Sequence, residues 1–402
     1  MIINSLNELK ERKLLEKKIV LWGIGNQTKE IITWLQGNHY GDNILFIVDN
    51  FKVTFYQKYE GIQVIEPDIL HSLEKSSFIV ILSINYAEDV RKQLAAYGVT
   101  EVYNLRSLQE QFSPFHYDIP YFFTDRSKGK RYLCYILTGY EPTLWDNIIS
   151  RIKAFENEMI DYCLISSGKH DDILEITADR NGWSYLWTEK NQVCFIQNLV
   201  MELHPKAEYV IKMDEDIFIG EYFFERMMRG YHRIEKDGEY RIGFVVPVVP
   251  LNCCGYVTYL KLTGRTAEFE KNFGRSYRSR FSAVFSIQET ARFLWDTMDT
   301  FDDMANTFLK HDGYSILDCY YNIGCIMFSR KRWLMMGKWP ELPGESGMGR
   351  DEVCICQDNR SKDMVIYELH DVLVGHLAFG HQKKDMLEYY HRHYDKFAIN
   401  GR

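Results

Sequence analysis

The acidic triplet Asp214-Glu215-Asp216 is the part of this sequence whose residue types and spacing most clearly point to chemistry. It ends an apolar run, YVI at 209–211, that predicts a buried strand. If the chain stays extended, alternate residues 214 and 216 point the same way. Two such carboxylates can hold a hard divalent cation, Mn²⁺ or Mg²⁺, and leave positions open for phosphate oxygens. The alternative is an ordinary acidic turn in solvent, because the chain has 56 acids and chance triplets are common.

The segments around the triplet predict an α/β domain. We expect strands at 131–140, 161–166, 183–188, 209–219 and 242–249. Helices are expected between them, at 144–155, 171–181 and 191–203, and the later sequence predicts helices at 286–300 and 385–395. Because strands and helices alternate, the strands should form a parallel sheet with right-handed crossovers.

A second alternation of strands and helices precedes this domain. Strands are expected at 19–22, 44–50, 77–84 and 101–105, and Gly23-x-Gly25 lies at the first strand-to-helix turn. In a dinucleotide-binding fold such glycines admit a pyrophosphate and an acid, here Asp49, binds the ribose. Thr28 stands where that fingerprint has its third glycine, so the alternative is that the glycines only form the turn. The segment resembles the small Rossmann-like modules attached to many bacterial sugar-modifying enzymes.

The sequence therefore predicts a Rossmann-like domain at 1–112, an aromatic connector at 113–130 and the larger domain at 131–402. The net charge of −8, without a strongly basic stretch, argues against nucleic acid as the main ligand. Nine cysteines without a Cys-x-x-Cys pair indicate reduced thiols of a cytosolic protein. The charged N-terminus predicts no signal peptide. The uncharged stretch 242–260 contains Pro247 and Pro250, so we read it as a buried strand and a loop and not as a membrane span.

From Arg131 to about His381 the chain resembles glycosyltransferases of the GT-A fold, closest in pattern to the large family 2 type. The resemblance is carried by three segments in order: VIKMDEDIF with the acidic triplet, the segment 330–355 with Gly337-Lys338-Trp339 and Asp351-Glu352, and VGHLAF around His376. It covers about two thirds of the chain. It implies a nucleotide-sugar donor, with UDP-sugars the leading expectation, and a glycan or lipid-linked acceptor.

The resemblance also implies roles for individual residues. Asp214, Asp216 and His376 would bind the metal, with His370 and His381 as competing histidines. Asp351 or Glu352 would take the proton from the acceptor hydroxyl in an inverting transfer, and the order of the pair leaves the choice open. Thr138, Tyr140 and Glu141 would lie against the base and ribose. Tyr320, Tyr321, Trp333 and Trp339 could form a sugar-stacking wall, and core packing explains them equally well.

The sequence thus predicts a cytoplasmic, metal-dependent glycosyltransferase of bacterial surface polysaccharide synthesis, associated with the inner face of the membrane only through its acceptor. One alternative is an NAD(P)-dependent oxidoreductase or epimerase that uses the N-terminal domain. It is weakened because residues 1–112 contain no Tyr-x-x-x-Lys pair. Another is a non-catalytic scaffold that senses a nucleotide, which the acids of both candidate sites argue against.

Overall fold

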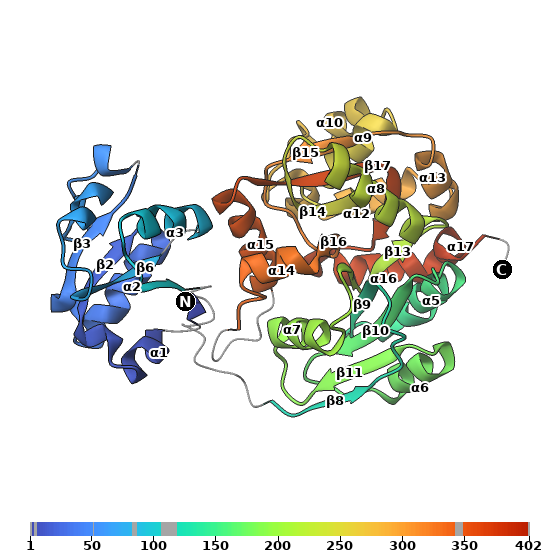
Figure 1. The fold of residues 1–402 in the computed structure, drawn as a ribbon. Helices are drawn as coiled ribbons and strands as arrows, with labels where there is room; N and C mark the ends of the chain where they lie inside the picture. The colour runs from blue at the N-terminus through green and yellow to red at the C-terminus, as the bar shows by residue number, and fades with distance from the viewer. Residues whose placement is uncertain are drawn as a thin grey trace. The chain divides into compact units, whose positions relative to one another are not determined.

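The structure is a computed structural model that describes residues 2–3, 6–50, 52–82, 87–105, 119–341 and 349–400. The chain divides into two compact units, Met1–His116 and Tyr117–Arg402. Figure 1 shows the helices and strands of each unit.

The first unit is a sheet flanked by helices. Its described elements are the strands β1 (Ile2–Ile3), β2 (Lys18–Trp22), β3 (Ile44–Val48), β4 (Lys58–Tyr59), β5 (Ile62–Ile65), β6 (Phe78–Leu82) and β7 (Val102–Leu105), and the helices α1 (Leu6–Glu11), α2 (Asn26–Gly37) and α3 (Ala87–Ala96). The strand order is β1-β7-β6-β2-β3-β5-β4, and every neighbouring pair except β4 with β5 is parallel.

Both faces of this sheet are buried, because successive side chains of a strand point to opposite faces. Ile19 and Leu21 of β2 belong to one core cluster, which also contains Ile31 of α2. Val20 belongs to a second cluster together with Leu94 of α3. The two helices therefore cover opposite faces of a parallel sheet (Figure 1), which explains the almost uninterrupted apolar runs of its strands.

The second unit has a larger mixed sheet. Its strands are β8 (Tyr121–Thr124), β9 (Tyr132–Thr138), β10 (Ile160–Ser166), β11 (Ser184–Thr188), β12 (Tyr209–Asp214), β13 (Ile217–Ile219), β14 (Arg241–Val248), β15 (Tyr314–Leu317), β16 (Cys325–Ser329) and β17 (Met364–His376). Its helices are α5 (Pro142–Ala154), α6 (Asp172–Asn181), α7 (Val193–Leu203), α8 (Phe223–Asp237), α9 (Gly255–Leu262), α10 (Thr266–Phe273), α11 (Ala283–Ser286), α12 (Glu289–Asp296), α13 (Phe301–Phe308), α14 (Arg330–Met336), α15 (Arg350–Ser361), α16 (Lys383–Arg392) and α17 (Tyr394–Phe397).

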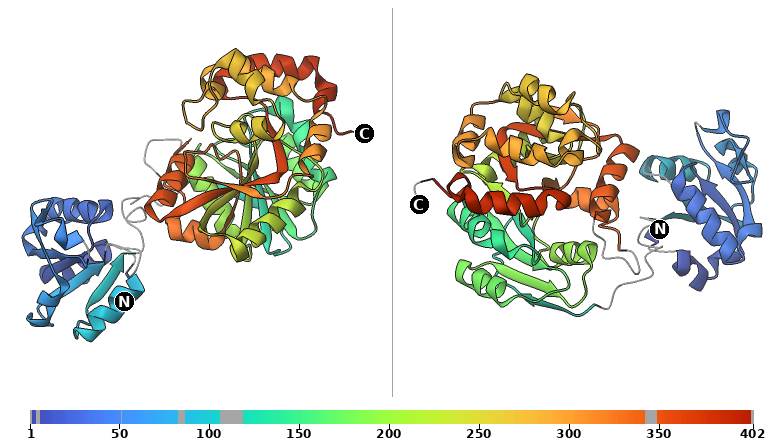
Figure 2. Two further views of the ribbon diagram at one scale, coloured as in Figure 1. Left: turned by 90° about the horizontal axis from the view of Figure 1, so that it is seen from above. Right: turned by 180° about the vertical axis from the view of Figure 1, so that it is seen from behind.

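The strand order of this sheet is β13-β17-β14-β16-β12-β9-β10-β11-β8, with β15 paired to β17. The pairs β11–β10, β10–β9 and β9–β12 are parallel, whereas β16 is antiparallel to both of its neighbours. The helices α9 to α13 gather on one side of the unit (Figure 2). The α/β class predicted for both domains is confirmed. The sheet of the first unit is parallel apart from β4, as expected, whereas the sheet of the second unit is mixed and not parallel throughout, because β8, β13, β15 and β16 pair antiparallel with their neighbours.

Two expectations about local structure differ from what is observed, and a third falls outside the described residues. The stretch 209–219 is two strands and not one, because the chain turns at Glu215 and Asp216. Residues 121–124 of the predicted connector form β8, which pairs antiparallel with β11. The predicted boundary at 112–113 lies outside the described residues.

The uncharged stretch 242–260 begins with the predicted buried strand, β14, but the predicted loop extends only over 249–254, and residues 255–260 belong to the helix α9. Within the described residues, none of the helices combines the length and the apolar character that crossing a membrane requires.

Candidate active site

The predicted acids lie where parallel strands of the larger sheet end. β9 and β12 are neighbours, and Asp214 is the last residue of β12, in register with Leu137 of β9. The backbone N–H of Asp214 donates to the carbonyl of Gly324, 2.8 Å away, just before β16. A Cβ on Gly324 would lie 3.4 Å from Asp214 Oδ2, so this glycine lets the chain pass close to the carboxylate. The sheet thus places the loops after β9, β12 and before β16 around one carboxylate.

Asp214 is paired with Lys212, two residues earlier on the same strand. Lys212 Nζ lies 2.6 Å from Asp214 Oδ1 and donates to the carbonyl of Ile323 at 2.9 Å. Burial raises the pKa of Asp214 to about 6, although the positive charge of Lys212 opposes the shift. Burial acts against the charge on Lys212, but Asp214 and Asp351 together raise its pKa above the ordinary value. Lys212 is therefore a buried counter-charge of the acidic site.

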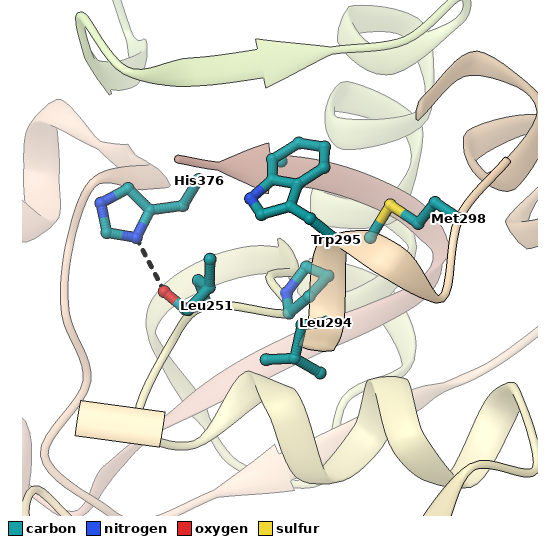
Figure 3. Close-up of a pocket in the computed structure, with 7 residues that line it drawn as sticks. Leu251, Leu294, Trp295, Met298 and His376 are labelled. Carbon is teal, nitrogen blue, oxygen red and sulfur yellow. Dashed lines mark hydrogen bonds between the residues drawn. The ribbon is translucent and has the colours of Figure 1, made fainter. Parts of the chain in front are cut away.

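Asp216 faces His376 at the end of β17. Ile217 is in register with His376 in the antiparallel pair β13–β17, which brings Asp216 Oδ2 within 3.3 Å of His376 Nε2. The other ring nitrogen, Nδ1, lies 2.7 Å from the carbonyl of Leu251 (Figure 3). A carbonyl accepts only from N–H, so Nδ1 carries a proton and Nε2 is the atom turned to Asp216.

The charges of this pair stabilise each other. Burial acts to raise the pKa of Asp216, yet His376 and Lys383 hold that pKa below its ordinary value. Burial acts to lower the pKa of His376, yet Asp216 raises it above the ordinary value. Of the three candidate histidines, only His376 reaches Asp216. His370 bonds the Ser315 hydroxyl at 2.8 Å, and the His381 ring packs on Phe285.

Glu215, the middle acid, points into the loop after β9. Its Oε2 accepts the N–H of Gly139 at 2.9 Å and the indole N–H of Trp145 at 2.6 Å, and its Oε1 accepts the N–H of Tyr140 at 2.9 Å. Gly139 has a φ of 119°, and a Cβ there would lie 2.5 Å from Ser166 Oγ. A residue other than glycine would be strained and crowded at this position. Glu215 therefore fixes the backbone of the loop that carries Tyr140.

The residues predicted to contact the nucleoside lie in this loop region. Tyr140 is 48% exposed, and its hydroxyl donates to the carbonyl of Ser167. Thr138 is buried and its hydroxyl donates to the carbonyl of Ile165 at 3.1 Å. Glu141 is also buried and its Oε2 lies 2.7 Å from Lys383 Nζ. Tyr140 is thus the one of the three with a surface open to a ligand.

The second acid pair begins α15. Asp351 is 5% exposed and accepts the amide of Gln197 at 2.9 Å. Glu352 is half-buried, and its carboxylate accepts the side-chain amide of Asn322 at 3.1 Å and the backbone N–H of Ile323 at 3.3 Å. Burial raises the pKa of Glu352, and hydrogen bonds from Tyr320 and Asn322 oppose that shift. Glu352 is the more accessible acid, and it contacts the same 322–324 segment that contacts Asp214 and Lys212.

The donor set at Asp214, Asp216 and His376 suits a divalent cation in its chemistry, but the structure does not bring one ligand atom of each residue within 4.8 Å of the other two. Two carboxylates and an imidazole with a fixed tautomer are ligands that Mn²⁺ accepts. Asp214 Oδ1 is bonded to Lys212, so its second oxygen is the one available.

Ligand atoms of a different trio, His170, Asp172 and Glu175, all lie within 4.8 Å of one another, and no other such trio occurs in the described part of the chain. Its imidazole is 2.9 Å from Glu175 and 3.5 Å from Asp172, so an ion pair at the surface accounts for it.

The aromatic wall is largely core. Tyr321, Trp333 and Trp339 are each at most 2% exposed, whereas Tyr320 is half-buried, and burial and the nearby Glu352 carboxylate raise its pKa. Sequence reasoning missed Lys212, a lysine inside an apolar strand directly before an acid, which is a readable signal of a buried ion pair. It also missed Lys383, for which the sequence gives no signal, because Lys383 meets Glu141 through tertiary folding alone.

In the first unit, Asp49 serves the glycine turn. Its Oδ2 accepts the N–H of Ile24 at 3.0 Å and its Oδ1 accepts the N–H of Lys52 at 2.8 Å. The Thr28 hydroxyl donates to the carbonyl of Gly23 at 2.7 Å. These bonds account for the turn without a nucleotide. Above Gly25 a Cβ would meet nothing within 4 Å, so the turn is open on that side.

Beside His376 the apolar side chains Leu251, Leu294, Trp295 and Met298 pack around a pocket that has no room for a water molecule (Figure 3). It does not suit a nucleotide.

Comparisons with known proteins cover parts of the chain. Residues 15–103, which lie in the first unit, match the family model described as C2185-like, N-terminal. No curated protein matches the sequence.

Several solved structures are similar at low identity. One is described as a mycobacterial protein, 14% identical over 62% of this chain and 68% of that chain, with a TM-score of 0.33. Another is glucosyl-3-phosphoglycerate synthase from Mycobacterium tuberculosis with Mg²⁺ and UDP, 16% identical over 65% of this chain and 77% of that chain, with a TM-score of 0.34. A third, the same enzyme with Mn²⁺, UDP-glucose and phosphoglyceric acid, is 19% identical over 37% of this chain and 53% of that chain, with a TM-score of 0.24. These TM-scores are too low for the likenesses to assign an activity.

Proposed function

We propose that the larger unit is a metal-dependent glycosyltransferase that moves a sugar from a nucleotide-sugar donor to a hydroxyl acceptor. The observation that carries the proposal is the pairing of Asp216, in the turn after β12, with His376 Nε2 at the end of β17. Asp216 and His376 are far apart in the sequence, and Asp214 is close enough to affect the pKa of His376. An acidic turn that only faces solvent would not need such a partner.

In this proposal Asp214, Asp216 and His376 hold the divalent cation. When bound, the cation supplies positive charge that offsets the charge of the departing nucleoside diphosphate. Lys383, which already lowers the pKa of Asp216, contributes a second positive charge at the same edge. Tyr140, held by Glu215, offers its exposed ring to the base of the donor.

The acceptor side is formed by Glu352. Its accessible carboxylate is the better placed of the two acids to take a proton from an acceptor hydroxyl, since Asp351 is more buried and bonded to Gln197. A carboxylate base on the acceptor side corresponds to an inverting transfer. UDP-sugars remain the leading donor class, and a bacterial surface polysaccharide the leading product, on the resemblance of the sequence.

The first unit has no part in the chemistry of this proposal. One carboxylate oxygen of Asp49 accepts from Ile24 in the glycine turn, and the other accepts from Lys52 in the turn after β3. Both oxygens therefore serve the backbone and not the ribose of a dinucleotide, which disfavours the oxidoreductase alternative.

The test is a panel of nucleotide sugars incubated with the full chain and Mn²⁺ or EDTA, with release of the nucleoside diphosphate measured. We expect hydrolysis of one donor class that depends on the metal and is abolished in Asp216→Asn. Glu208→Gln, which alters an exposed acid far from the site, is the matched control. Metal-independent release, or release unchanged in Asp216→Asn, would contradict the proposal.

A further inference from the structure

Arg280 lies beside the candidate base through one intervening aromatic side chain. Its guanidinium carbon is 4.6 Å from the centre of the Tyr320 ring, and burial together with the neighbouring Glu352 carboxylate raises the pKa of Tyr320. Arg280 itself is exposed and Tyr320 is half-buried. A guanidinium that lies over an aromatic ring can still donate its N–H groups to a ligand.

The loop that carries Arg280 is anchored along its length to α9 and the residues before it. The backbone N–H of Tyr277 donates to the Tyr256 hydroxyl at 2.9 Å, and that hydroxyl donates to the carbonyl of Tyr277 at 2.8 Å. The Cys253 thiol donates to the carbonyl of Arg280 at 3.5 Å. The position of Arg280 is therefore set by the fold.

The Tyr320 segment is fixed to the same point. The Cys254 thiol donates to the carbonyl of Tyr320 at 3.2 Å, and Asn252 donates to the carbonyl of Asn322 at 3.0 Å. Two chain segments, 277–281 and 319–322, are thus held by neighbouring residues at the start of α9. The backbone of Arg280 and the backbone of the segment that contacts Glu352 are consequently held by the same short stretch of chain, residues 252–254.

Arg280 has no carboxylate partner among the residues that the structure describes, whereas Arg278 two positions earlier lies 3.9 Å from Glu368 and donates to the Thr258 hydroxyl. Asp214 at the end of β12 and Asp351 and Glu352 in the first turn of α15 give the site negative charge. A neutral acceptor needs no cation here. An acceptor with an anionic group, by contrast, would be repelled by those acids unless a fixed cation holds it on the far side of Glu352.

We infer that the acceptor carries a phosphate or carboxylate group, which pairs with Arg280 and presents a neighbouring hydroxyl to Glu352. The inference rests on the proposed function and specifies its substrate class. Arg280 would act in acceptor specificity, because it touches the anion and not the reacting hydroxyl. The planar fork of arginine suits both oxyanions, which accept two parallel N–H bonds.

The test measures acceptor binding apart from metal and donor. The full chain in EDTA is titrated with glycerol 3-phosphate, with glycerate and with glycerol by calorimetry. We expect the two anions to bind and glycerol not to bind. Arg280→Ala should weaken anion binding roughly 10- to 100-fold, the range for hydrogen bonds to a charged group, and Arg280→Lys should recover part of it. Arg275→Ala, which removes an exposed arginine from the same loop, should bind the anions as the wild type does.

Two further measurements are made. The first distinguishes a lipid phosphate from a soluble one, and the second tests the proposed function independently of the inference about Arg280. Flotation with phosphatidylcholine vesicles containing phosphatidic acid shows whether a lipid phosphate is held through Arg280 as the soluble ester is. Binding of UDP with Mn²⁺, measured in parallel, should be the same in the wild type and in Arg280→Ala. If UDP binds but the anions do not bind, or bind Arg280→Ala equally well, the inference is wrong and the proposed function stands. If UDP does not bind the wild type, the proposed function fails whatever the anion result.

Discussion

Glu368 lies in the middle of β17 and is fully buried. Its Oε2 accepts the hydroxyl of Thr258, and the nearest guanidinium, that of Arg278, is 3.9 Å away. Burial raises the pKa of Glu368 from 4.5 to about 8, while Thr258 and Arg278 oppose the shift. The folded protein therefore keeps a proton on this carboxyl at neutral pH, and the unfolded chain releases it.

The sign of the effect on stability follows from that difference. Because the folded-state pKa is the higher one, the contribution is fully present below pH 4.5 and is lost as the pH rises to about 8. Each pH unit in this interval lowers the free energy of unfolding by about 1.4 kcal/mol. Between pH 5 and pH 7.5 the loss amounts to roughly 3 kcal/mol.

Glu368→Gln removes the titration and keeps the shape and an oxygen that accepts from Thr258. We expect the free energy of unfolding of the variant, relative to the wild type, to rise by about 3 kcal/mol from pH 5 to pH 7.5. The assay is urea unfolding followed by tryptophan fluorescence at four pH values, with the difference between the two proteins taken at each. Glu208→Gln, an exposed control, should differ from wild type by no more than about 0.5 kcal/mol. A difference for Glu368→Gln that does not change with pH would show that the carboxyl is ionised and paired with Arg278.

The remaining predictions concern the site. Asp216→Asn should weaken Mn²⁺ binding at least about 10-fold, measured by calorimetry, without lowering the melting temperature by more than a few degrees. Glu352→Gln should lower kcat by roughly 10²- to 10⁴-fold with donor affinity unchanged, and Asp351→Asn should have the smaller effect; the reverse ranking in steady-state kinetics would assign the base to Asp351. Glu215→Gln should raise the KM for the donor, because the amide cannot accept all three N–H groups as a carboxylate does; an unchanged KM would separate that loop from donor binding. The fragment 119–402 should transfer sugar at the rate of the full chain, and an inactive but folded fragment would give the first unit a role in turnover.

The last prediction changes where the chain should be cut. The sequence places the start of the larger domain at residue 131, so a cut near Lys128, in the predicted connector, would be expected to leave that domain whole. In the structure β8 ends at Thr124 and completes the edge of the larger sheet, and the backbone N–H of Arg126 donates to the Ser184 hydroxyl at 2.9 Å. A cut at Lys128 would remove this strand.

Several strands could be predicted because they are short, apolar and separated by clear helices. β9, β10 and β11 lie within a few residues of their predicted bounds. β17 could not be read in the same way, since His370 and Asp371 interrupt its apolar pattern and its pairing with β13, β14 and β15 is decided by tertiary contacts.

The acids of the candidate site could be named from the sequence, but not their arrangement. Alternation along an extended strand predicts a common side for Asp214 and Asp216, whereas the chain turns at residues 215–216 and pairs the two acids with different partners, Lys212 and His376. Such partners depend on which strands become neighbours, and the spacing of residues in one segment does not contain that information.

Lys212 has a consequence for how the proposed enzyme would pass through a catalytic cycle. Carboxylates that lie close together repel one another, and without a neighbouring positive charge they move apart or take up protons when a bound cation leaves. Here an ammonium that is 2% exposed, 2.6 Å from Asp214 and bonded to the Ile323 carbonyl, is built into the strand itself. The acids keep this neighbour at every stage, so departure of the nucleotide and its cation need not be accompanied by rearrangement of β12. The site would be ready for the next donor as soon as the last product has diffused away.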